Sequence, residues 1–116
     1  GPAHTGKDTL ARIFSAEGLK LGIPSIWVVT DRTWAQVKED LAALFPGYAE
    51  AEKNGMIRFV DLYSRSVGST QSGPGVRLLS STDRGVLDQL ATTVNGFSEE
   101  LKARHPTYRL VFESVS

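Results

Sequence analysis

The sequence predicts an α/β protein with a mainly parallel sheet and helices on both of its faces. Helix-like and strand-like segments alternate along the chain, which is the element order of a parallel layer fold with right-handed crossovers. The strand-like run 24–30 is apolar without alternation, as expected of a strand that is covered on both faces. The length of 116 residues leaves room for one domain.

The apolar spacing predicts a helix over residues 9–20, which Gly18 and Gly22 bring to an end. Residues 24–30 are the first predicted strand. Thr33 is the expected N-cap of the next helix. The apolar residues of that helix repeat at helical spacing up to Pro46-Gly47, and they are Trp34, Val37, Leu41 and Leu44.

The second half of the chain continues the alternation. A short helix is predicted over residues 48–53 and a second strand over 56–61. Residues 64–81 are rich in Ser and Gly and lack periodicity, and we expect 68–75 to be a mobile surface loop. An apolar face predicts the last helix over 83–103, and a third strand follows at 108–112. Trp27 and Trp34 are expected in the core.

The amino-acid composition narrows the range of functions that we expect for this chain. Thirteen basic residues balance thirteen acidic ones, so the net charge predicts no strong attraction to nucleic acid or anionic membranes, although a local patch is still allowed. Without cysteine, and with only two histidines, disulfides, thiol metal sites and structural zinc are not expected. No apolar run approaches the ~18 residues that span a bilayer, and no signal peptide is recognisable. We therefore expect a cytoplasmic protein.

The first nine residues carry most of the functional signal. They fit the phosphate-binding pattern G-x-x-x-x-G-K-[S/T] except at its last position, where Asp8 replaces the hydroxyl residue. Glycines let backbone N–H groups turn toward phosphate oxygens, and the lysine neutralises the β- and γ-phosphates. The pattern predicts ATP and Mg²⁺ as ligands. The predicted nucleotide-binding residues are Gly1, Pro2, Ala3, His4, Thr5, Gly6, Lys7, Asp8 and Thr9.

Two questions stay open at this motif. Asp8 can bind Mg²⁺ through its carboxylate, or it can simply complement the positive end of the helix dipole. In addition, nothing precedes Gly1, although a phosphate-binding loop normally follows a buried strand. We expect the chain to be a piece of a longer protein. The alternative is that Gly1-Pro2 is a protease-cleavage scar and that the motif match is partly accidental.

Three further stretches agree with the motif in order and spacing. The segments GPAHTGKDTLA with AEGLK, IWVVTDRT, IRFVDLYSRSVG and RLVFESVS together resemble KaiC-like ATPases of the RecA superfamily. The resemblance implies a three-layer RecA-like P-loop domain. Residues 1–116 would form part of such a domain, from the P-loop to the Walker B strand, without the first and the later strands.

The resemblance also assigns roles to acids that follow strands. Asp31 stands where the family has a general base for the attacking water, and Glu113 stands where it has the Walker B aspartate. Asp8 and Glu113 would therefore be the metal ligands, and Asp31 the catalytic residue. Asp31 can equally cap the next helix, Arg32 is expected to be an exposed arginine, and Asp61 is expected to be structural.

The motif departs from the family at Asp8, Asp31-Arg32 and Glu113, so the sequence predicts weak or no hydrolysis. The resemblance implies an ATP-binding signalling or regulatory ATPase that forms a homo-oligomer, either a ring or a dimer, and acts on protein partners. The first alternative is a non-catalytic scaffold, or pseudo-ATPase. Others are a recombinase-like DNA-binding module, which the neutral charge disfavours, and an unrelated α/β domain with a chance loop.

Overall fold

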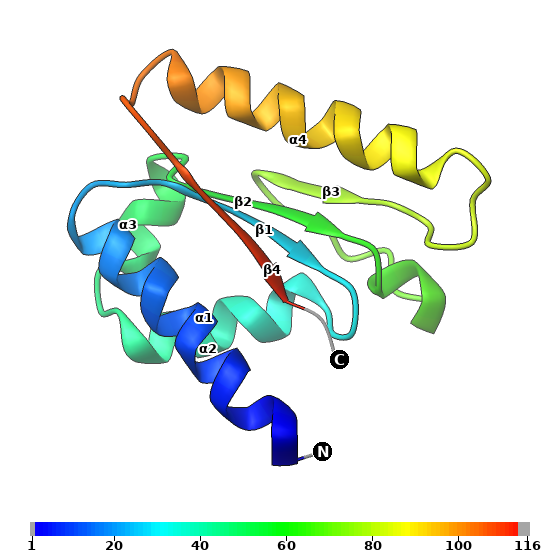
Figure 1. Cartoon of the computed structure of the whole chain (residues 1–116), viewed down its shortest axis with the longest axis horizontal. Helices are drawn as coiled ribbons and strands as arrows, with labels where there is room; N and C mark the ends of the chain where they lie inside the picture. The colour runs from blue at the N-terminus through cyan, green and yellow to red at the C-terminus, as the bar shows by residue number, and fades with distance from the viewer. Residues whose placement is uncertain (1, 114–116) are drawn as a thin grey trace.

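The computed structural model describes the backbone of residues 2–113 and the side chains of residues 10–113. Its centre is a four-stranded, all-parallel sheet with the strand order β3-β2-β1-β4 (Figure 1). The strands are β1 (Ser25–Val29), β2 (Ile57–Asp61), β3 (Val76–Leu78) and β4 (Arg109–Glu113). The predicted α/β fold with a mainly parallel sheet is confirmed.

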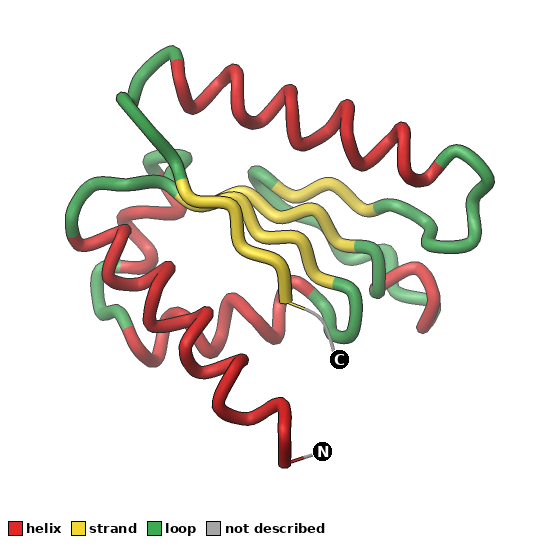
Figure 2. The backbone as a smooth tube through the Cα atoms, viewed as in Figure 1, coloured by secondary structure: helices red, strands yellow, loops and turns green. Residues whose placement is uncertain are grey.

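Helices cover both faces of the sheet and give the molecule three layers (Figure 2). One face packs against α1 (Pro2–Lys20), α2 (Trp34–Leu44) and α3 (Tyr48–Lys53). The other face packs against α4 (Val86–Lys102). This arrangement is compatible with part of a three-layer RecA-like domain. None of the described helices is long and apolar enough to cross a membrane.

Strand β1 runs through the middle of the sheet, and all five of its residues are buried. Trp27 and Val29 belong to the core under α1 and α2, whereas Ile26 and Val28 belong to the core under α4. The segment therefore lacks polar alternation because the strand is covered on both faces, as predicted. Trp27 is fully buried, and its indole Nε1 donates a hydrogen bond to Ser15 Oγ of α1 at 3.0 Å.

The start of α2 follows the predicted capping chemistry. The Thr33 hydroxyl accepts a hydrogen bond from the Gln36 backbone N–H, and the Gln36 side chain accepts one from the Thr33 backbone N–H. This reciprocal capping box satisfies two N–H groups that no helical carbonyl can reach. It also fixes the direction in which the chain leaves β1.

Three elements differ from the prediction. The 3₁₀ helix η1 (Ser64–Val67) and strand β3 both lie inside the segment predicted to be irregular. Strand β3 pairs with β2, Phe59 opposite Val76. Three residues are too few to show a strand period, so the neighbouring strand rather than the local sequence defines it. Helix α1 begins at Pro2 and not at Thr9. Proline suits a first helical position because its missing N–H would have no helical partner there.

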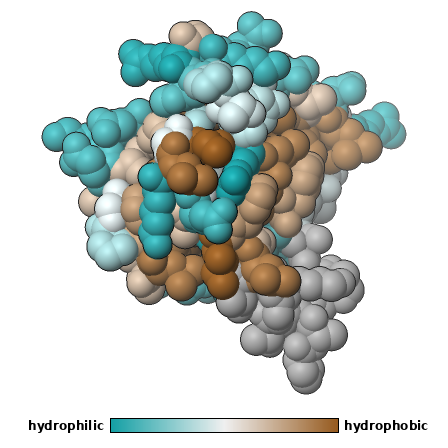
Figure 3. Space-filling view, turned by 60° about the vertical axis from the view of Figure 1, so that its left-hand side comes forward, coloured by the Kyte–Doolittle hydropathy of each residue, from teal (hydrophilic) through white to brown (hydrophobic). Residues whose placement is uncertain are grey.

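Strand β4 forms one edge of the sheet, and apolar side chains on it stay exposed. Phe112 is 60% exposed and Leu110 41% exposed. Phe14 of the adjacent helix α1 is also exposed, and the Arg109 guanidinium lies 4.0 Å from its ring centroid. Figure 3 shows patches of apolar residues between the polar residues on the surface of the molecule. An open edge flanked by apolar groups favours association with another chain.

Candidate functional site at the carboxyl ends of the strands

Two acidic residues end the two strands that flank β1, and they lie at the same level of the sheet. Val29, the last residue of β1, is in register with Asp61 of β2 on one side and Glu113 of β4 on the other. Residues in register on parallel strands share a face, so both acids lie on the face that α1 and α2 cover. Open α/β sheets place their ligands at the carboxyl ends of strands. This edge is therefore the candidate site.

Asp61 has a structural role, as predicted. It is fully buried. Its Oδ2 accepts hydrogen bonds from the Trp34 backbone N–H at 2.8 Å and from the Ser64 hydroxyl at 2.5 Å. Its Oδ1 accepts bonds from the backbone N–H groups of Tyr63 and Ser64, both at 2.7 Å. Asp61 thus joins the start of α2 to the chain that leaves β2, and it leaves little acceptor capacity for a ligand.

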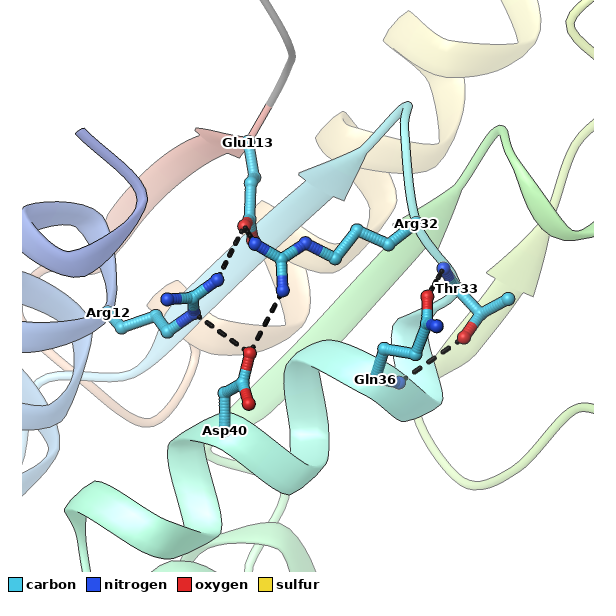
Figure 4. A network of polar contacts seen from close by, with 6 residues as sticks. All are labelled: Arg12, Arg32, Thr33, Gln36, Asp40 and Glu113. Atoms are coloured by element: carbon cyan, nitrogen blue, oxygen red, sulfur yellow. Dashed lines mark hydrogen bonds and ion pairs between the residues drawn. The ribbon is translucent and has the colours of Figure 1, made fainter. Parts of the chain in front are cut away.

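Glu113 is held by two arginines. Its side chain is only 1% exposed, and its Oε1 lies 2.9 Å from Arg32 Nη2 and 3.3 Å from Arg12 Nη2. Both arginines also contact Asp40 Oδ2 of α2, Arg32 through Nη1 at 3.0 Å and Arg12 through Nε at 3.2 Å. The four side chains close a ring of alternating charge, which we call the charge ring (Figure 4).

The charge ring connects four separate parts of the fold. Arg12 belongs to α1, Arg32 to the segment between β1 and α2, Asp40 to α2 and Glu113 to β4. Its two carboxylates differ in environment, because the Asp40 side chain is 42% exposed. Glu113 therefore forms the buried side of the ring and Asp40 forms its solvent side.

The prediction that Arg32 is an exposed arginine was wrong. Its side chain is 24% exposed and forms ion pairs with two acids, Asp40 and Glu113. Sequence reasoning missed Arg12 altogether. A signal was present, since Arg12 precedes the buried residues Ser15, Ala16 and Leu19 by helical spacings. An arginine on the apolar face of a helix needs a buried acid nearby.

Asp31 lies just after β1 and does not cap α2, because Thr33 does so. Its Oδ1 is buried and makes no hydrogen bond within the described residues. Asp31 lines an open hollow of 440 Å³ beside the charge ring, together with Arg32, Gln36, Glu39, Asp40 and Tyr63. The hollow gives a ligand access to Asp31, whose catalytic role stays a prediction.

The predicted nucleotide-binding residues are only partly described. Gly1 lies outside the described residues. The positions from Pro2 to Thr9 belong to α1, but their side chains, including those of His4, Lys7 and Asp8, lie outside the described part. In the helix, Asp8 precedes Arg12 by one turn. The motif is therefore continuous with the helix that carries an arginine into the charge ring.

Comparison with known proteins gives one partial similarity. No known protein-family profile matches the chain. The chain is similar to the UPF0273 protein PH0284 of Pyrococcus horikoshii, with 30% identity over 71 residues, or 61% of this chain. The match covers 29% of that protein. The matched part of the chain therefore spans less than a third of the length of this relative.

Proposed function

We propose that this chain is a nucleotide-binding unit of a KaiC-like regulatory ATPase and that it binds ATP with weak or no hydrolysis. The observation that carries the proposal is the course of α1. This helix begins with the phosphate-binding motif and places Arg12 3.3 Å from Glu113, at the edge where α/β sheets bind ligands.

Nucleotide binding requires a local change in α1. A phosphate cradle needs successive backbone N–H groups that turn inward. Helix α1 starts at Pro2, so its N–H groups point along the helix axis, and from Gly6 onward they can be bonded to carbonyls within the helix. Residues 2–8 make up about two helical turns. We propose that these turns open into a loop around the phosphates, after which the remaining helix points its positive end at them.

Asp31 is the proposed water-activating base, because it follows β1 and lines the hollow beside Arg32 and Asp40. Slow or absent turnover is proposed because arginines already occupy Glu113, the acid in the Walker B position. In the absence of turnover, the protein would act as a scaffold. For the slow ATPase and for the scaffold alike, we propose a homo-oligomer or a complex with a protein partner, because the exposed edge of β4 could pair with another chain.

Lys7→Ala is expected to weaken ATP binding by about tenfold or more, because a charge-assisted contact to phosphate contributes about 1.5–3 kcal/mol. Isothermal titration calorimetry measures the change. Lys20→Ala is the matched control, since Lys20 lies in the last turn of the same helix, and it should bind as the unmodified chain does. Absence of ATP binding by the folded, unmodified chain would contradict the proposal. ATP turnover that disappears in Lys7→Ala would exclude the scaffold.

One observation favours a second candidate function, the binding of single-stranded nucleic acid. The sequence shows no basic and aromatic stripe, but folding brings Arg58, Arg65 and Arg77 together with Phe97 around a hollow of 580 Å³. These residues come from β2, from the 3₁₀ helix η1 (Ser64–Val67), from β3 and from α4. The Arg58 guanidinium lies 5.4 Å from the Phe97 ring centroid. Basic grooves with an aromatic platform suit phosphodiester strands and their bases.

Arg77→Gln is expected to weaken binding of a short single-stranded oligonucleotide and to reduce the logarithmic salt slope by about 0.7, the value for one lost phosphate contact. Fluorescence anisotropy at several salt concentrations gives both quantities. Arg84→Gln serves as the control because Arg84 does not line the hollow. Equal losses in the two variants, or binding without salt dependence, would exclude this function for the hollow.

A further inference from the structure

The family resemblance implies a magnesium ion held partly by Glu113, and the surroundings of Glu113 do not fit that ion. Mg²⁺ requires a near-octahedral set of oxygen ligands at short range. Glu113 Oε1 instead lies within 3.3 Å of two guanidinium groups. A divalent cation at this oxygen would stand beside two permanent positive charges and be repelled by both. Among the described residues, no three acidic or histidine side chains gather in a possible metal site.

We propose that Arg12 and Arg32 take the place of the metal and that the chain binds ATP without Mg²⁺. This inference rests on the proposed function and concerns the same site. Arginine keeps its charge at all physiological pH values, and its planar fork matches phosphate oxygens. Two such groups, already fixed on one buried acid, supply a positive centre where the resemblance would place the ion.

The exposures in the charge ring indicate where a phosphate would enter. The Glu113 side chain is 1% exposed, whereas that of Asp40 is 42% exposed. Asp40 Oδ2 contacts Arg12 Nε and Arg32 Nη1, so it occupies the solvent-facing side of both guanidinium groups. An incoming triphosphate would displace Asp40 and leave Glu113 in place. Asp40 is thus an internal anion that competes with the ligand.

This arrangement makes opposite predictions for two members of the ring. Arg32→Gln removes a cation that contacts the phosphates and should weaken ATP binding by about tenfold. Asp40→Asn removes the competing carboxylate and should tighten ATP binding by several-fold. A purely structural ring predicts the reverse for Asp40, since loss of any member would then loosen the site.

The experiment is calorimetric titration of ATP into the full chain, once with excess Mg²⁺ and once with EDTA. The unmodified chain, Arg32→Gln, Asp40→Asn and Glu39→Gln are compared after circular dichroism has shown that each is folded. Glu39→Gln is the matched control, because Glu39 lies next to Asp40 in α2 and lines the same hollow outside the ring. We expect similar affinities in Mg²⁺ and EDTA, the two opposite shifts described above, and little effect of Glu39→Gln.

Each other outcome has a definite meaning. Binding that needs Mg²⁺ and does not change in Arg32→Gln overturns the inference and leaves the proposed ATP binding intact. Equal tightening in Asp40→Asn and Glu39→Gln assigns the effect to net charge and removes the competing role of Asp40. No ATP binding by the folded chain in either buffer overturns the proposed function, and the inference falls with it.

Discussion

Asp61→Ala is expected to lower the free energy of unfolding by about 3–5 kcal/mol. The substitution leaves the backbone N–H groups of Trp34, Tyr63 and Ser64 and the Ser64 hydroxyl without the acceptor they now share. An unsatisfied buried donor costs about 1–3 kcal/mol, and partial access of water reduces the sum. Urea denaturation followed by tryptophan fluorescence measures the loss, since Trp27 and Trp34 are both buried.

Asp83→Ala is the control for this prediction. Asp83 also accepts hydrogen bonds from a backbone N–H and from a side chain, Gly85 N and Gln89 Nε2, but it does so in an exposed turn. Water can replace these bonds, and the urea midpoint should hardly change. A loss in Asp61→Ala as small as that in Asp83→Ala would show that the carboxylate at the end of β2 does not hold the two segments together.

The fold could be predicted because its main signals are local. The apolar run of β1, the N-cap residue Thr33 and the apolar face of α4 are properties of short segments, and each was found where the sequence placed it. Strand β3 could not be predicted in this way. Its pairing with β2 defines it, and its register depends on a partner that lies beyond the Ser/Gly segment.

The candidate site likewise contains residues that the local sequence could predict and residues that only the tertiary fold brings together. A glutamate after apolar residues at a strand end pointed to a role for Glu113, and Asp61 could be assigned as structural. The arginines that hold Glu113 could not be predicted, because Arg12 is 101 residues away in sequence. Their meeting depends on the parallel register of β1 and β4 and on the packing of α1 over them. The basic hollow around Arg58, Arg65 and Arg77 was missed for the same reason.

Glu113→Gln is expected to lower the free energy of unfolding by about 2–4 kcal/mol, and Asp40→Asn by no more than about 1 kcal/mol. The two acids contact the same two arginines. The comparison therefore measures how burial of the carboxylate changes its contribution to stability. Removing the buried carboxylate leaves two largely buried guanidinium groups that share only the more exposed acid of the charge ring, Asp40. Removing the exposed one leaves groups that water and salt can screen. Urea denaturation of both variants gives the difference.

A double-mutant cycle tests whether this difference belongs to the charge ring. Arg32→Gln combined with Glu113→Gln should be less destabilising than the sum of the two single changes, with a coupling of about 1–3 kcal/mol, because the first substitution already removes the partner of the second. The cycle of Arg32→Gln with Asp40→Asn should give a smaller coupling that falls further at high salt. If both cycles gave equal couplings, Asp40 would be held as firmly as Glu113. An incoming phosphate would then not displace Asp40 in preference to Glu113. The two cycles, measured without nucleotide, therefore test the difference between the two acids on which the proposed Mg²⁺-independent binding of ATP depends.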